Sequence, residues 1–443
     1  ADGSSNFAPG KQWGYFPSIS GGWVLTSESF METQQKWLEF FKLRASWGQN
    51  GNQSITPFQY LSTIASDADG NYAFDRGVQK TLSSGAYPNI LPSPDISWET
   101  SEQTNLGFDA RFLNSRLGVA FDWYSKVTRD WLVQAPILAS YGTAASFING
   151  GDVENKGVEI ALNWSDKSGE FTYDVNLNLA SNKNEVLNIA NSEGIIHGAI
   201  NVLSNNTPEV YRAQVGYPIG YFWGFKTAGV FQNENDVLNY VNSNGEMLQP
   251  TAKPGDVKFV DFNGDGKFNS GNEDKTMIGN PNPELTIGLS FSVAYKGFDL
   301  SMNSTGVFGN SVIQNYRTFG LPQQNYPTAI LGRWTGEGTS DRLPRMMYSP
   351  HPNFMNISDL YVQDASYWRI TNLTFGYDFK KIWKNAPLQQ LRAYVAVNNL
   401  ATFTNYTGMD PNVGYGEEPW AKGVDIGFYP APRTAMFGVS IVY

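Results

Sequence analysis

The sequence predicts an all-β protein: an antiparallel transmembrane β-barrel with long strands. Three observations carry this prediction. Apolar residues recur at every second position over long runs, short turns alternate with long loops, and helical patterning is nearly absent. A period of two indicates a strand with one apolar face, and a membrane-crossing strand needs about 9–11 such residues. Soluble strands average about 5–6 residues.

The strand candidates follow in chain order. Between Leu285 and Tyr295 every odd-numbered residue is apolar and every even-numbered residue is small or polar. The second face therefore suits a water-filled or plugged interior. At about 10 residues per segment, we expect roughly fourteen such strands. The clearest runs are 116–125, 158–164, 171–180, 285–295 and 437–443.

The connections fall into two size classes. The short ones are Asn114-Ser115, Asp166–Glu170 and Lys296-Gly297. The long ones are 66–97, 130–152, 185–219, 232–282, 309–364 and 402–432. This alternation is typical of outer-membrane barrels, with periplasmic turns and extracellular loops, and is unusual for compact soluble domains. Ser27–Phe41 fits either a short helix after a Ser cap or a loop with one turn.

Composition excludes several classes of function. The chain has 443 residues, a formal net charge of −10, two His and no Cys. The missing Cys excludes disulfides, thiolate metal sites and a cysteine nucleophile, and the acidic balance argues against nucleic-acid binding. The sequence contains no run of 18 apolar residues, so it predicts no transmembrane helix. A membrane could then be crossed only by β-strands.

Aromatic side chains gather where strands are expected to end, which favours interfacial girdles over ordinary core or sugar-stacking residues. These residues are Trp13, Tyr15, Phe16, Trp123, Tyr124, Trp131, Tyr221, Phe222, Trp223, Phe225, Trp368, Tyr377 and Phe379. A second set lies in expected loops and fits either substrate stacking or loop packing. It comprises Trp131, Tyr141, Phe147, Tyr211, Tyr316, Tyr326, Tyr348, Phe354, Tyr415 and Trp420.

One acidic loop resembles a Ca²⁺ site, because oxygen-bearing residues stand at positions 1, 3 and 5 with Gly at position 6. The spacing departs from the rule, since position 12 is Asn272 and an acid follows only at Glu273 or Asp274. The alternative is a polar turn without metal; a bound Ca²⁺ would be structural. The candidate ligands are Asp261, Asn263, Asp265, the Lys267 carbonyl and Asp274.

No enzyme signature emerges. The chain has no Gly-x-Ser-x-Gly elbow, and both histidines, His197 and His351, lie in loop-like stretches. Three acidic groups could imitate a glycosidase pair, but solvated loop acids are the favoured interpretation. They are Asp95/Glu99/Glu102, Glu234/Asp236 and Glu417-Glu418.

Several long motifs resemble the C-terminal part of SusC-like (RagA-like) TonB-dependent outer-membrane transporters. They are ADGSSNFAPGKQWGYFPSISGGW (1–23), LRASWGQNGNQSI (43–55), SWETSEQTNLGFDARFLNSRL (97–117), GGDVENKGVEIALNW (150–164), RWTGEGTSDRLPR (333–345), QDASYWRITNLTFGYDF (363–379), LRAYVAVNNLATFTNYTGMDPNV (391–413) and YPAPRTAMFGVSIVY (429–443). The likeness covers residues 1–443 as one C-terminal barrel portion with long extracellular loops.

The resemblance implies a 22-stranded barrel, of which this chain would supply about the last two-thirds. The plug, the TonB box and the first strands would belong to an upstream part, separated by cleavage after a basic residue. A SusD-like surface lipoprotein would cap the barrel, TonB would supply energy through the plug, and two barrel–lid pairs would dimerise. The protein would then import oligosaccharides or oligopeptides across the outer membrane of a Gram-negative bacterium, without a required cofactor.

Three other interpretations remain open. A siderophore- or cobalamin-type TonB-dependent receptor would share the barrel but lack the lipoprotein lid. A soluble secreted glycan-binding β-protein would also explain the aromatics, the acidic balance and the strands. A passive porin would conduct without TonB, although the family motifs argue against it.

Overall fold

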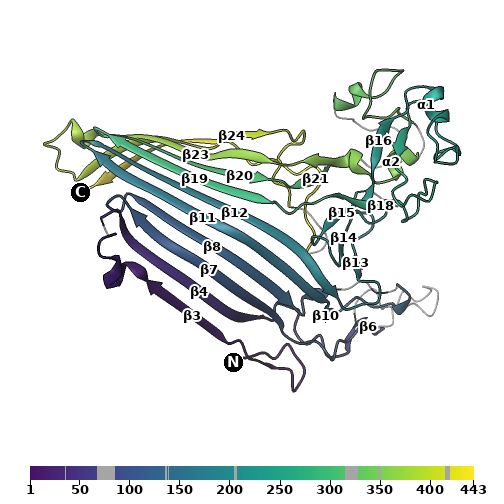
Figure 1. Ribbon diagram of the computed structural model, residues 1–443, viewed down its shortest axis with the longest axis horizontal. Helices are drawn as coiled ribbons and strands as arrows, with labels where there is room; N and C mark the ends of the chain where they lie inside the picture. The colour runs from purple at the N-terminus through teal and green to yellow at the C-terminus, as the bar shows by residue number, and fades with distance from the viewer. Residues whose placement is uncertain are drawn as a thin grey trace, which may run out of the picture.

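One large antiparallel sheet forms most of the computed structural model (Figure 1). The structure describes residues 1–34, 36–66, 85–134, 137, 139–203, 207–314, 328–347, 351–414 and 420–443. The sheet has 11 strands in the spatial order β26-β24-β23-β20-β19-β12-β11-β8-β7-β4-β3. We call this sheet the wall. Its strands are β3 (Ser18–Val24), β4 (Leu38–Asn52), β7 (Glu99–Phe112), β8 (Leu117–Arg129), β11 (Gly151–Ser168), β12 (Phe171–Ile189), β19 (Leu285–Tyr295), β20 (Phe298–Phe308), β23 (Tyr367–Asp378), β24 (Gln390–Thr404) and β26 (Thr434–Val442).

The wall strands confirm the alternation seen in the sequence. β19 has the predicted bounds 285–295, and the runs 116–125, 158–164, 171–180 and 437–443 all lie in wall strands. β11 and β12 are 18 and 19 residues long, far beyond the average strand of a soluble sheet. Sequence periodicity therefore identified the wall correctly.

The number of wall strands was overestimated, since eleven replace the expected fourteen or so. The stretch after residue 219, which the sequence left between two long loops, forms β15 (Tyr221–Phe225) and β16 (Thr227–Val230) outside the wall. Residues 190–284 are thus one connection. Eleven strands make half of a barrel of about 22 strands, not two-thirds.

Short and long connections lie at opposite ends of the wall (Figure 1). At one end, Lys296-Gly297 joins β19 to β20 with φ values of 50° and 93°, the left-handed pair that a two-residue hairpin requires. We call this the short-turn end; its connections are 25–37, 113–116, 169–170, 296–297 and 379–389. The opposite, long-loop end carries 53–98, 130–150, 190–284, 309–366 and 405–433.

The segment between β3 and β4 resolves the open helix prediction. It contains two 3₁₀ turns, Leu25–Ser27 and Ser29–Met31, and then enters β4 at Leu38. The loop alternative is therefore correct. Within the described ranges, no helix combines the length and the apolar character needed to cross a membrane.

Three long connections, 190–284, 309–366 and 405–433, fold together into what we call the mouth (Figure 1). One buried cluster unites them through Phe222, Ile313 and Val424. Among the described residues, most of the largest fully buried side chains lie here, so the main core lies in the mouth. Its elements are β13 (Ile195–His197), β14 (Tyr211–Gln214), β15, β16, α1 (Glu234–Leu238), β17 (Val257–Phe259), β18 (Lys275–Gly279), β21 (Ser311–Gln314), α2 (Pro352–Met355), β22 (Val362–Asp364) and β25 (Val424–Asp425).

Short hairpins complete the long-loop end. Each pairs two strands; one precedes β3, and the other two lie in the connections 53–98 and 130–150. The strands are β1 (Asp2–Gly3), β2 (Trp13–Gly14), β5 (Thr63–Ala65), β6 (Tyr87–Ile90), β9 (Leu132–Gln134) and β10 (Phe147–Asn149).

Candidate functional site: membrane belt, lumen face and mouth

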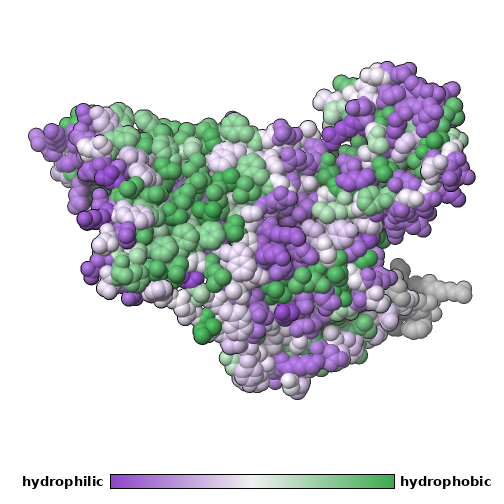
Figure 2. Space-filling model, in the orientation of Figure 1, coloured by the Kyte–Doolittle hydropathy of each residue, from purple (hydrophilic) through white to green (hydrophobic). Residues whose placement is uncertain are grey.

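An apolar belt covers one face of the wall. Residues paired directly across antiparallel strands point to the same face, so the strand register can be followed from strand to strand. One row runs from β7 to β19 and consists of Phe108, Phe121, Ile160, Leu179 and Ile287. Figure 2 shows the hydrophobic surface gathered over the part of the wall nearer the short-turn end. Large apolar surfaces of this kind mark contact with lipid or a partner.

The belt has the height of a bilayer core. On β12 the apolar positions begin at Phe171 and give way to Ser181 and Lys183 on the same face. Ten residues of strand tilted by about 45° rise about 23 Å. Outer-membrane barrels carry an apolar band about 25 Å tall. The register and the length of β12 thus fit a membrane crossing.

Aromatic rings line the short-turn edge of the belt. The ring of Phe298 lies 4.4 Å from that of Tyr377, which lies 5.1 Å from that of Phe379. Phe171 and Tyr295 contact each other on neighbouring strands, with ring centroids 6.3 Å apart. This edge has the composition of an interfacial girdle, as the sequence predicted for Tyr377 and Phe379.

The girdle prediction was wrong for the aromatic group at 221–225. Tyr221, Phe222 and Phe225 are between 0 and 1% exposed and pack in the mouth. Trp131 also lies at the mouth, where its ring is 6.2 Å from that of Trp420. Aromatics at strand ends look alike in a sequence whether they face lipid or a loop core, because both settings favour large apolar rings.

The opposite face of the wall, which we call the lumen face, is polar. Arg44 on β4 lies 2.8 Å (Nε to Oδ2) from Asp109 and 2.9 Å (Nη1 to Oδ1) from Asp122. Gly107 stands between them, and a Cβ there would come closer than 3.0 Å to the Asp122 carboxylate. The sequence places a residue without a side chain where the two charged groups must meet.

Amide side chains extend this polar surface across the wall. Asn372 donates to the Oδ1 of Asn398 at 2.8 Å, and Arg392 donates to the Oδ1 of Asp299 at 2.9 Å. A hollow of about 550 Å³ lies on the wall beside Lys42 and Arg111. The one-sided polarity suits a wet or plugged lumen. The row of paired positions contains Asn163, Asn176, Ser290, Asn303, Asn372 and Asn398.

Several charged side chains are buried inside the mouth. Arg212 is 4% exposed, forms an ion pair with Glu209, and its guanidinium carbon lies 3.8 Å from the ring centre of Trp223. Glu209 also accepts the N–H of Gly198 at 3.1 Å. Burial lowers the pKa of Lys275 and raises that of Tyr221. Sequence analysis missed these charges, because burial of a loop residue leaves no periodic signal.

The loop aromatics proposed for substrate contact have different fates. Trp420 and Tyr211 pack together with ring centroids 5.6 Å apart, and Phe354 is buried. Tyr141 is 58% exposed and free of such packing among the described residues. Loop packing therefore accounts for most of the described set. Tyr316, Tyr326, Tyr348 and Tyr415 lie outside the described residues.

The acidic loop is organised by its own backbone. Asp261 accepts the N–H groups of Gly264 and Gly266 at 2.7 and 2.8 Å. Asp274 is fully buried and accepts three N–H groups, from Phe262, Asn263 and Asn269. In the described chain, no three His, Asp or Glu side chains converge as a metal-binding group. The first positions keep the oxygen donors that suit Ca²⁺.

Most of the described acid candidates have structural partners. Asp95 pairs with Lys11 at 2.9 Å, and Asp236 pairs with Lys258 at 2.7 Å. Glu99 accepts the N–H of Leu132 at 2.9 Å.

The two histidines are distant in sequence and make different, separate contacts. The Nδ1 of His197 is 3.0 Å from Glu209, whereas His351 caps α2 by accepting the N–H of Asn353. The pair Glu417-Glu418 lies outside the described residues.

Known proteins with similar sequences are β-barrel receptors, in agreement with this geometry. A family model described as TonB dependent receptor-like, beta-barrel, matches residues 1–400. TonB-dependent receptor P3 of Formosa agariphila is 30% identical, over 100% of this chain and 43% of its own length. TonB-dependent receptor SusC of Bacteroides thetaiotaomicron is 29% identical, over 100% of this chain and 41% of its own length.

Solved structures agree on the fold. The RagAB peptide transporter superposes with a TM-score of 0.79 at 22% identity, covering 100% of this chain and 45% of the compared chain. The chain thus spans less than half the length of the relatives it matches. The matched family is one of outer-membrane receptors and transporters, not enzymes, which confirms the non-enzymatic prediction. The chain belongs to the TonB-dependent receptor-like β-barrel family, as a C-terminal part of SusC type.

Proposed function

We propose that the whole protein imports nutrient oligomers, oligosaccharides or oligopeptides, across the outer membrane by TonB-dependent transport. One observation carries the proposal: a single sheet combines a lipid-facing belt, a polar lumen face and a large folded mouth at one end. A transporter needs all three features, one for each environment it meets. The name of a similar solved structure, the RagAB peptide transporter, supports a peptide as one class of cargo.

The two edge strands of the wall support the proposal that further strands of the same protein complete the barrel. β3 and β26 each pair with one neighbour only within the described chain. An unpaired strand edge is costly in lipid, because its N–H and C=O groups find no water. Strands preceding residue 1 in the parent protein would close the barrel, and a plug there would fill the lumen and connect to TonB.

The mouth is the proposed docking surface for a SusD-like surface lipoprotein. Three connections far apart in sequence share one core there, which gives a partner a rigid surface rather than separate loops. Dimerisation of two barrel–lid pairs is part of the same proposal.

Intact masses of the complex purified from outer membranes test this proposal. We expect a plug-bearing segment and a lipidated second protein to copurify with the chain, and a lipoprotein deletion to abolish uptake of the oligomer. A plug segment without a lipoprotein would favour a siderophore- or cobalamin-type receptor. A chain found alone and water-soluble without detergent would contradict the proposal.

A further inference from the structure

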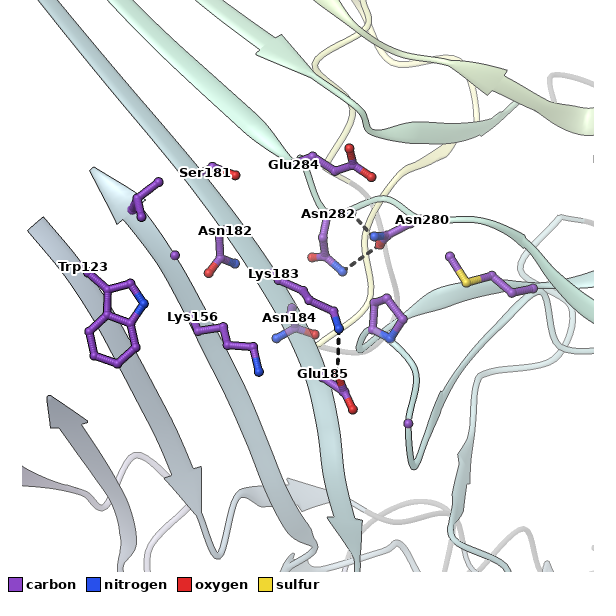
Figure 3. A pocket seen from close by; sticks show the side chains of 15 residues that line it. Trp123, Lys156, Ser181, Asn182, Lys183, Asn184, Glu185, Asn280, Asn282 and Glu284 are labelled. Carbon is purple, nitrogen blue, oxygen red and sulfur yellow. Dashed lines mark hydrogen bonds and ion pairs between the residues drawn. The ribbon is translucent and has the colours of Figure 1, made fainter. Parts of the chain in front are cut away.

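A groove lies on the outward face of the wall, where the belt ends toward the mouth (Figure 3). Its volume is about 640 Å³. Its floor is made by β11 and β12, and Trp123 on β8 borders one side. Pro218 and Met277 of the mouth also line it. β12 extends past the end of β19, so Val186 there pairs with Tyr217 instead, through a backbone hydrogen bond of 2.9 Å. The change of partner opens the groove.

Two lysines stand side by side on the groove floor. Lys156 and Lys183 are direct partners across β11 and β12, so both side chains point to the same face. Two residues farther from the belt, Glu154 and Glu185 are direct partners as well. Each ammonium reaches the glutamate of its own strand, at 2.7 Å for Lys156 and 3.1 Å for Lys183.

The lysines keep binding capacity despite these ion pairs. An ammonium group has three N–H donors, and among the described residues each lysine uses one of them, for its glutamate. The side chains of Lys156 and Lys183 are 43% and 69% exposed. Exposed pairs of this kind are weak, so a stronger acceptor can share the ammonium groups.

The groove lies at the level of lipid headgroups. On the same face, Val158 lies on the belt side of Lys156 on β11, and Leu179 lies on the belt side of Ser181 and Lys183 on β12. The belt therefore ends directly below the two ammonium groups. Trp123 pairs with Val158 and is 38% exposed at the same edge, the position of an interfacial indole. Because long loops of such barrels are extracellular, this edge faces the outer leaflet.

We propose that this groove binds the phosphorylated sugar headgroup of an outer-leaflet glycolipid. Phosphate oxygens accept hydrogen bonds from Lys156 and Lys183, which are charge-assisted and therefore strong. A sugar ring rests against Trp123, and the acyl chains lie along the belt below. Glu154 and Glu185 orient the lysines through their ion pairs. The site lies outside the lumen and the mouth, so it goes beyond the proposed transport function.

Glycolipid retention in the full-length protein tests the proposal. The protein is purified from outer membranes in mild detergent, and bound glycolipid is counted by native mass spectrometry and phosphate analysis. The test variant is K156Q/K183Q. The matched control is K296Q/K381Q, which removes two exposed lysines at the short-turn end of the same wall. We expect K156Q/K183Q to lower retention at least about tenfold through loss of two charge-assisted hydrogen bonds, and the control to retain as much as the wild type.

Three outcomes would overturn the proposal: equal retention in K156Q/K183Q and the wild type, equal retention of phosphatidylglycerol and glycolipid, or displacement of the glycolipid by inorganic phosphate. Heat-modifiable migration on a gel verifies that each variant is a folded barrel. The single variant K183Q and the variant W123A give the same test if the double variant does not assemble, and both should weaken retention. Oligomer uptake by the wild type is measured in parallel. If the wild type takes up no oligomer, that result contradicts the transport proposal but not the glycolipid site.

Discussion

Gly107 shows how the lumen face depends on a residue without a side chain. A Cβ at this position would come closer than 3.0 Å to the carboxylate of Asp122 and to the carbonyl of Phe121. Arg44 could then no longer reach Asp122 in its present geometry. Gly21 on β3 offers a matched control, since a Cβ there would meet nothing within 4 Å.

The variant G107A should therefore lower the free energy of unfolding by about 1–3 kcal/mol, the usual cost of overpacking. G21A should leave it nearly unchanged. Urea unfolding of the full-length protein in lipid vesicles, followed by tryptophan fluorescence, measures both. Equal midpoints for the two variants would show that the Arg44 cluster does not depend on Gly107.

Lys275 gives the mouth a dependence on pH. Burial lowers the pKa of Lys275 in the folded protein. The nearby Glu209 carboxylate raises this pKa, and the nearby Arg212 guanidinium lowers it further. Between this lowered value and the usual 10.5, the unfolded chain binds more protons than the folded one, so stability rises with pH. Unfolding midpoints measured from neutral pH upward should rise less in K275M than in the wild type. A parallel pH profile for both proteins would contradict this assignment, and K296M serves as the exposed control.

Sequence reasoning found the residues of the belt but not those of the mouth core. The strand at Leu285–Tyr295 is predictable because each apolar residue alternates with a small or polar one. Glu209, Arg212 and Lys275 carry no such signal, since loop charges are usually solvated and only the folded mouth buries them.

At the level of elements, wall strands were predictable and mouth strands were not. β11 and β12 hold one register over their whole paired length apart from a single bulge between Asp152 and Val153. β15 and β18 have only five residues each, and four of the five β15 residues are buried. A short strand that is buried on both faces shows no alternation of apolar and polar residues. The aromatic cluster of β15 was therefore interpreted as part of an interfacial girdle.

The acidic loop between β17 and β18 is the element whose function stays a proposal. Ca²⁺ held by Asp261, Asn263, Asp265 and the Lys267 carbonyl would require the buried Asp274 to turn from backbone N–H groups toward the metal. We expect binding with a Kd of about 10⁻⁴–10⁻³ M, as in extracellular modules, and an affinity about tenfold lower in D265N, which loses one charge. Calorimetry with the full-length protein measures this, with E246Q as a neighbouring acidic control. Absence of Ca²⁺-dependent heat would establish a metal-free turn.

At the scale of the whole molecule, the wall divides three environments. The belt meets lipid, the lumen face carries the Arg44 cluster and the amide row, and the mouth contains the largest buried cluster of the described residues. The sequence predicted the first two because alternation reports both faces of a strand at once. It could not predict the mouth as a unit, because connections 190–284, 309–366 and 405–433 meet only in three dimensions.

The most direct test of the account is nitroxide scanning of residues 285–295 in the full-length protein in outer membranes. The chain contains no Cys, so each introduced cysteine is unique within it. The account predicts that labels at odd positions are accessible to oxygen dissolved in lipid and labels at even positions to a water-soluble nickel complex, alternating along β19. Uniform accessibility to the nickel complex at both sets of positions would contradict a membrane-spanning wall.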